Sequence, residues 1–98
     1  EHFFVDKAFI GAGGVTFSGG VSDYNAEIEN RRVMFEHTSQ VILAADSGKF
    51  GMNAFTSICP IDDIDIIVSD DHLSHDYIDG IRERKIELIL ADTEEANP

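Results

Sequence analysis

The fold is decided by residues 41–51, which read VILAADSGKFG. The first five residues are apolar without alternation, a pattern typical of a strand buried on both faces in a parallel sheet. The apolar run then stops at a short polar segment that contains two glycines. We therefore predict a strand over Val41–Ala45 that ends in the turn Asp46–Gly51.

Three more apolar runs predict strands before and after this one, at Ala8–Ile10, Ile64–Ser69 and Ile86–Leu90. The first of them is followed at once by the glycine-rich segment Gly11–Gly20, which we interpret as a loop because glycines punctuate regular structure.

Helices are expected in the two longer connections. Ser22 offers an N-cap for a helix over about residues 23–38, and Ser74 offers one for a helix over His75–Arg84. Strands joined by crossover helices pair in parallel. The predicted fold class is α/β, with a mainly parallel sheet covered by helices.

The composition indicates one small globular domain over residues 1–98, with residues 92–98 as a solvated tail. With 43% hydrophobic and 27% charged residues, the chain is expected to bury a packed core. It has no apolar run of the roughly 20 residues needed to span a bilayer, and its one cysteine, Cys59, excludes an internal disulfide. We predict a cytoplasmic protein whose preceding residues are missing from this sequence.

The charge argues against one class of function. The chain has 19 acidic and 7 basic residues, a formal net charge of −12. Such a field repels nucleic acid and anionic lipid. We expect the chain by itself to bind neither DNA nor a membrane.

Ligands of open parallel sheets bind beyond the carboxyl ends of the strands. The first predicted strand empties into the glycine-rich loop, where the backbone N–H groups of Gly13, Gly14 and Gly20 can approach a phosphate. A flexible connector with no ligand explains the same glycines equally well.

The second strand end places Asp46 three residues before Lys49. The ammonium of Lys49 can hold a phosphate, and the carboxylate of Asp46 can accept hydrogen bonds from sugar hydroxyls. An exposed ion pair between the two side chains is the alternative interpretation.

The third strand end carries residue types that suit a divalent metal, namely Asp70, Asp71, His72, His75 and Asp76. A strand end followed by a carboxylate-rich helix start explains them without a metal. We therefore expect no metal and no cofactor. Cys59 lies between isoleucines and is expected to be a buried, unreactive thiol.

Four blocks of the sequence resemble, in the same order, the effector domain of DeoR-type transcription regulators. The blocks are Asp6–Val15, Glu29–Met34, Val41–Gly51 and Ile64–Asp70. The similarity runs from about Val5 to Asp92, and the turn that reads DSGKFG is its most specific part.

The resemblance implies a fold akin to ribose-phosphate isomerases and coenzyme A transferases, present here as a partial domain. It also implies a homo-oligomeric repressor that a phosphorylated sugar releases from DNA, with DNA contacted only through an N-terminal winged helix-turn-helix absent from this sequence. The inducer response is assigned by resemblance to Asp46 and Lys49. The remaining predicted ligand residues lie beside them: Gly13, Gly14, Gly20, Ser22, Asp23 and Glu27.

Two other functions fit the residues. One is a sugar-phosphate isomerase or deaminase on the same fold, with Glu27 or Asp46 as general base. The other is an acidic protein-interaction module without a ligand. Turnover of a sugar phosphate identifies the enzyme, and stabilisation by a sugar phosphate excludes the module without a ligand.

We predict that the 98-residue chain does not retard duplex DNA at physiological salt, because its net charge of −12 opposes the phosphate contacts that dominate non-specific affinity. The measurement is a gel-shift assay at micromolar protein. Retardation of DNA by this chain alone would contradict the prediction.

Overall fold

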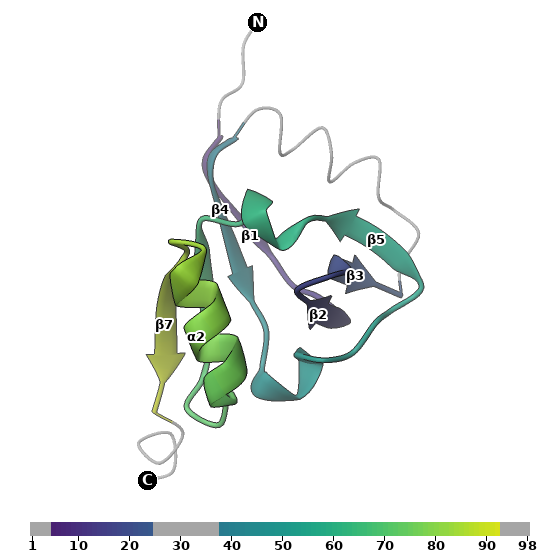
Figure 1. Ribbon diagram of the computed structural model, residues 1–98. Coiled ribbons are helices and arrows are strands. Elements are labelled where there is room, and N and C mark those ends of the chain that lie inside the picture. The colour runs from purple at the N-terminus through teal and green to yellow at the C-terminus, as the bar shows by residue number, and fades with distance from the viewer. Residues whose placement is uncertain (1–4, 25–37, 93–98) are drawn as a thin grey trace, which may run out of the picture.

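The computed structural model of the chain describes residues 5–24 and 38–92 (Figure 1). Its elements in chain order are β1 (Val5–Ile10), β2 (Gly14–Thr16), β3 (Gly20–Asp23), β4 (Thr38–Ala44), the 3-10 turn η1 (Ser47–Lys49), β5 (Thr56–Cys59), the 3-10 turn η2 (Ile61–Asp63), β6 (Ile66–Asp70), α2 (His75–Glu83) and β7 (Glu87–Ala91).

Strands β1, β4, β6 and β7 form one sheet in that spatial order, and all three pairings are parallel. The four strands are those predicted from the apolar runs, so the α/β class with a mainly parallel sheet is confirmed. The β6 strand begins at Ile66 rather than at Ile64, because the N–H of Ile64 closes η2 by donating to the carbonyl of Ile61 at 3.0 Å.

The core lies between this sheet and α2. Leu43 of β4, Ile67 of β6 and Ile81 of α2 are all fully buried members of one cluster. Burying each such side chain stabilises the fold by about 1.5–3 kcal/mol. Burial on both faces is confirmed for β4 at residues 41–43, but it is wrong for β1, a strand at the edge of the sheet whose Phe9 is 69% exposed.

The helix α2 begins where its sequence predicts. The Oγ of Ser74 accepts a hydrogen bond from the N–H of Tyr77 at 3.5 Å, which satisfies one donor of the first turn. Among the described residues, no helix has the length and apolar composition needed to cross a membrane.

The glycine-rich segment differs from the prediction, since it forms an antiparallel hairpin of β2 and β3 that continues into β5. The predicted helix over residues 23–38 is wrong at both ends, because Asp23 belongs to β3 and Thr38 begins β4. Ser22 is therefore no N-cap. It pairs with Gly14 across the hairpin and is 5% exposed. Residues 25–37 of that helix lie outside the described residues.

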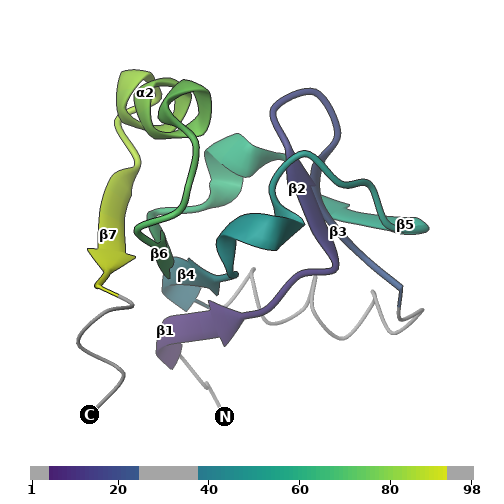
Figure 2. The ribbon, with the colours of Figure 1, turned by 90° about the horizontal axis from the view of Figure 1, so that it is seen from below.

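The hairpin tip and α2 rise on the same side of the parallel sheet (Figure 2). The ring of Phe17 stacks on the ring of Tyr77, with 4.6 Å between their centroids. The guanidinium of Arg84 lies over the same Phe17 ring, 4.3 Å from its centroid. A Cβ atom on Gly80 would lie 2.3 Å from Cζ of Phe17, so the ring approaches the helix where it has no side chain. Through these contacts of Phe17 with α2, the three-stranded sheet of β2, β3 and β5 packs against the helix that covers the four-stranded parallel sheet.

We expect Phe17→Ala to lower the free energy of unfolding by about 2 kcal/mol, because a half-buried ring loses its contacts with α2. Phe55→Ala is the matched control. Phe55 is 88% exposed, and its removal should cost less than about 1 kcal/mol. Denaturant unfolding of both variants measures this difference, and equal losses would contradict the docking role of Phe17.

Candidate functional site

Three strand ends meet at one edge of the parallel sheet, as the sequence predicts. Strand β4 pairs in parallel with β1 through Leu43 and Ile10, and with β6 through Ala44 and Val68. The segments that begin at Gly11, Ala45 and Asp71 therefore leave the sheet at the same edge. The contacts below show which of their residues come together.

The turn after β4 is shaped by its own residues. The Oδ1 of Asp46 accepts a hydrogen bond from the N–H of Gly48 at 2.9 Å, and the N–H of Lys49 donates to the carbonyl of Asp46 at 3.0 Å. The side chains of Asp46 and Lys49 form no ion pair, so that alternative interpretation is wrong. Within residues 5–24 and 38–92, no carboxylate forms a salt bridge with Lys49, which is half-buried.

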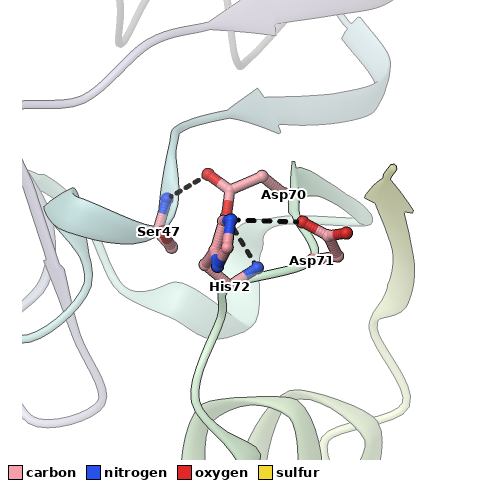
Figure 3. A network of polar contacts seen from close by, with 4 residues as sticks. All are labelled: Ser47, Asp70, Asp71 and His72. Atoms are coloured by element: carbon pink, nitrogen blue, oxygen red, sulfur yellow. Dashed lines mark hydrogen bonds and ion pairs between the residues drawn. The ribbon is translucent and has the colours of Figure 1, made fainter. Parts of the chain in front are cut away.

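Asp70, the last residue of β6, holds this turn from the neighbouring strand (Figure 3). Its Oδ2 accepts the N–H of Ser47 at 2.8 Å, and its Oδ1 accepts the N–H of His72 at 2.9 Å. The bond from Ser47, followed by that from His72, lowers the pKa of the Asp70 carboxyl below its usual value. Asp70 is therefore ionised at neutral pH.

The other residues of this cluster take part in the strand end and the helix start. The Nε2 of His72 lies 3.7 Å from Oδ1 of Asp71 (Figure 3), and Asp76 lies in the first turn of α2. The described residues hold no group of three or more side chains placed to bind a metal ion. Sequence reasoning missed the bond between Asp70 and Ser47, which are 23 residues apart. No local spacing signals such a contact.

The segment after Lys49 lies beside strand β2. The N–H of Gly51 donates to the carbonyl of Val15 at 2.7 Å, and Val15 forms a parallel bridge with Phe50. A Cβ atom on Gly14 would lie 2.1 Å from the carbonyl oxygen of Met52. The structure thus brings the glycine-rich segment next to the turn, a placement that the sequence alone supported only by resemblance.

The other predicted ligand residues have roles in the hairpin or its surroundings. The hydroxyl of Ser22 donates to the carbonyl of Gly14 at 3.2 Å and accepts the N–H of Ala54 at 2.9 Å, so the fold already uses both functions of this group. Gly20 has a φ of 72° and packs against the carbonyl of Cys59.

Of the remaining three residues, Gly13 and Asp23 have backbone partners in or next to the hairpin. The N–H of Gly13 donates to the carbonyl of Ser22 at 2.8 Å. Asp23 accepts a hydrogen bond from the N–H of Tyr24 at 2.7 Å. Glu27 lies outside the described residues.

The thiol of Cys59 has the environment predicted for an unreactive group. The residue is 6% exposed, and burial, followed by the charge of Asp63, raises its pKa to about 11. A nucleophilic thiol needs the opposite shift. Cys59 is therefore part of the core.

Comparison with known proteins identifies relatives of this chain. Residues 1–71 match the family model described as the DeoR C terminal sensor domain. The chain is 30% identical over 91 residues to a candidate aga operon transcriptional repressor of Escherichia coli O157:H7. It is 27% identical over 93 residues to the HTH-type transcriptional repressor GlcR of Bacillus subtilis. It is 24% identical over 91 residues to a glycerol-3-phosphate regulon repressor of Haemophilus influenzae.

These alignments take in most of this chain and a smaller part of each relative. They cover 92%, 95% and 92% of the chain, in the same order, but 34%, 36% and 35% of the relatives. The chain thus spans about a third of the length of these repressors.

We expect Gly14→Ala to destabilise the chain by at least about 2 kcal/mol, since the new methyl group would overlap the carbonyl of Met52 and separate β2 from the turn segment. Gly11→Ala is the control, because the nearest atom to its Cβ would be 4.0 Å away. Thermal unfolding measures both variants. A Gly14→Ala chain as stable as the control would remove the structural role assigned to Gly14.

Proposed function

The chain belongs to the DeoR C-terminal sensor domain family, and from this we propose that it is the effector-sensing part of a transcriptional repressor that responds to a phosphorylated sugar. The effector binds at the carboxyl edge of the parallel sheet, over the turn Asp46–Lys49. Its phosphate is held by Lys49, and its hydroxyls donate to Asp46.

The environment of Lys49 is the observation that most supports this proposal. A dianionic phosphate that approaches a chain of net charge −12 is repelled unless a local cation offsets the field. Lys49 lies at the expected edge, and no described carboxylate neutralises its ammonium through a salt bridge. Its charge is therefore available to an anion. A relative named for a glycerol-3-phosphate regulon fits a phosphorylated effector.

The other predicted residues have supporting roles in this proposal. Gly14, Gly20 and Ser22 build the hairpin beside the turn, and Gly13 lies in the connection that leads into it. Asp23 follows at the end of β3. Glu27 remains a proposed ligand residue from the resemblance alone.

The whole repressor, in this proposal, is a cytoplasmic homo-oligomer that contacts DNA through an N-terminal winged helix-turn-helix. The chain's fold is akin to that of ribose-phosphate isomerases. The enzyme alternative has less support, because the matched relatives are named as transcriptional regulators.

A thermal-shift screen of the chain against phosphorylated sugars, with the unphosphorylated sugars as controls, tests the function. At least one phosphorylated sugar should raise the melting temperature, since ligands that bind the folded state stabilise it. If none does so at millimolar concentration, the proposed function is wrong.

We predict that Lys49→Ala weakens binding of that phosphorylated sugar by about tenfold or more, because a charge-assisted bond contributes about 1.5–3 kcal/mol. Lys7→Ala removes the same charge from an exposed position on β1 and should leave the affinity nearly unchanged. Calorimetric titration of both variants measures the difference. Equal affinities in Lys49→Ala and the unmodified chain would exclude Lys49 from the site.

A further inference from the structure

We propose that Asp70 is a positioning residue of the effector site, whose carboxylate holds the turn Asp46–Lys49 in the placement that presents Lys49 to the phosphate. This inference rests on the proposed function. It adds a residue from β6 to a site assigned so far to the end of β4 and the glycine-rich segment.

The turn needs such a support, because its internal hydrogen bonds set its shape and not its position on the sheet. Both bonds between Asp46 and the N–H groups of Gly48 and Lys49 lie within the turn. Other contacts fix the segment from outside. The N–H of Ala45, just before the turn, donates to the carbonyl of Val68 at 3.0 Å, and Phe50, just after it, pairs with Val15 and packs against Tyr77. Two further hydrogen bonds hold the two ends of the turn itself. The bond from Gly51 to the carbonyl of Val15 anchors its far end, and the bond from Ser47 to Asp70 anchors its start.

A carboxylate suits this position better than any neutral side chain. Two backbone donors, from Ser47 and His72, converge on the two oxygens of Asp70 at 2.8 and 2.9 Å. An asparagine amide offers one acceptor oxygen and one donor group, so one of the two N–H groups would face another donor. The lowered pKa of Asp70 agrees with a carboxylate that stays ionised to receive both bonds.

The charge of Asp70 makes the inference testable, because charge and position predict opposite effects. A negative charge near an anion site weakens phosphate binding by repulsion, so removing it should strengthen binding. If Asp70 positions the turn, its removal should weaken binding instead. Asp71 is the matched control, since Asp71→Asn removes the same charge one residue away and leaves the bond to Ser47 intact.

A second variant removes the same hydrogen bond without changing the charge. Ser47 is the first residue of η1, where proline is tolerated, and the preceding Asp46 already has the extended backbone that proline requires, with φ of −68° and ψ of 162°. Ser47→Pro deletes the N–H that donates to Asp70. If Asp70→Asn does not fold, Ser47→Pro still tests the effect of losing this hydrogen bond.

The experiment is an amide NMR study of the 98-residue chain and the variants Asp70→Asn, Ser47→Pro and Asp71→Asn. Without ligand, hydrogen exchange of the Gly48 and Lys49 amides should speed up at least tenfold in the first two variants only. In titrations with glucose 6-phosphate and inorganic phosphate, the first two variants should bind at least tenfold more weakly, and Asp71→Asn should bind equally well or more tightly.

The outcomes separate the two proposals. Unchanged exchange at Gly48 and Lys49, or tighter phosphate binding by Asp70→Asn, overturns the positioning role. Failure of the unmodified chain to bind either probe, or any phosphorylated sugar of the thermal-shift screen, overturns the proposed function instead. In that case the exchange rates still decide whether Asp70 holds the turn.

Discussion

Strand β4 lies between β1 and β6 with both pairings parallel, and the rest of the structure depends on this arrangement. Parallel pairing sends the carboxyl ends of all three strands to one edge, which no antiparallel arrangement of the same strands would do. Leu43 of β4 is fully buried in one cluster with Val15 of β2 and Ile81 of α2. The polar turn after β4 consequently meets residues from two other parts of the chain.

The contacts at this edge give the turn its support. Asp70 reaches it from β6, and β2 reaches it through the pairing of Val15 with Phe50. The rings of Phe50 and Phe17 both contact Tyr77 of α2. The distance between ring centroids is 5.4 Å for Phe50 and Tyr77, and 4.6 Å for Phe17 and Tyr77. The same helix that covers the sheet thus holds the turn segment and the hairpin together.

The sequence predicts the four strands of the parallel sheet because short apolar runs bounded by polar residues and glycines are a local signal of strands. It predicts α2 for a similar reason, since Ser74 caps the helix that follows it. The small sheet was missed because β2 has three residues and opens on a glycine, which favours a loop interpretation. The sequence alone favours a helix start at Ser22, because the same hydroxyl suits an N-cap or, as the structure shows, a buried link between two backbone segments.

The sequence identifies Asp46 and Lys49 as candidate ligand residues, but it does not predict the contacts that hold their turn in place. Asp46 and Lys49 stand out as polar residues that follow an apolar run, but nothing in their spacing shows that Asp46 caps the turn rather than pairing with Lys49. The bond from Ser47 to Asp70 spans 23 residues, and the overlap that excludes a side chain at Gly14 spans 38 residues to Met52. Such contacts arise only when the strands are placed in their spatial order.

We propose that this acidic sensor chain receives the phosphate of its effector at the turn after β4. The measurement that tests it most directly is a crystal structure of the chain with the phosphorylated sugar that stabilises it best. The phosphate should lie within hydrogen-bond distance of the Lys49 ammonium, beside the turn that Asp70 holds. A phosphate bound away from the carboxyl edge of the parallel sheet, with Lys49 in contact with solvent alone, would contradict the claim.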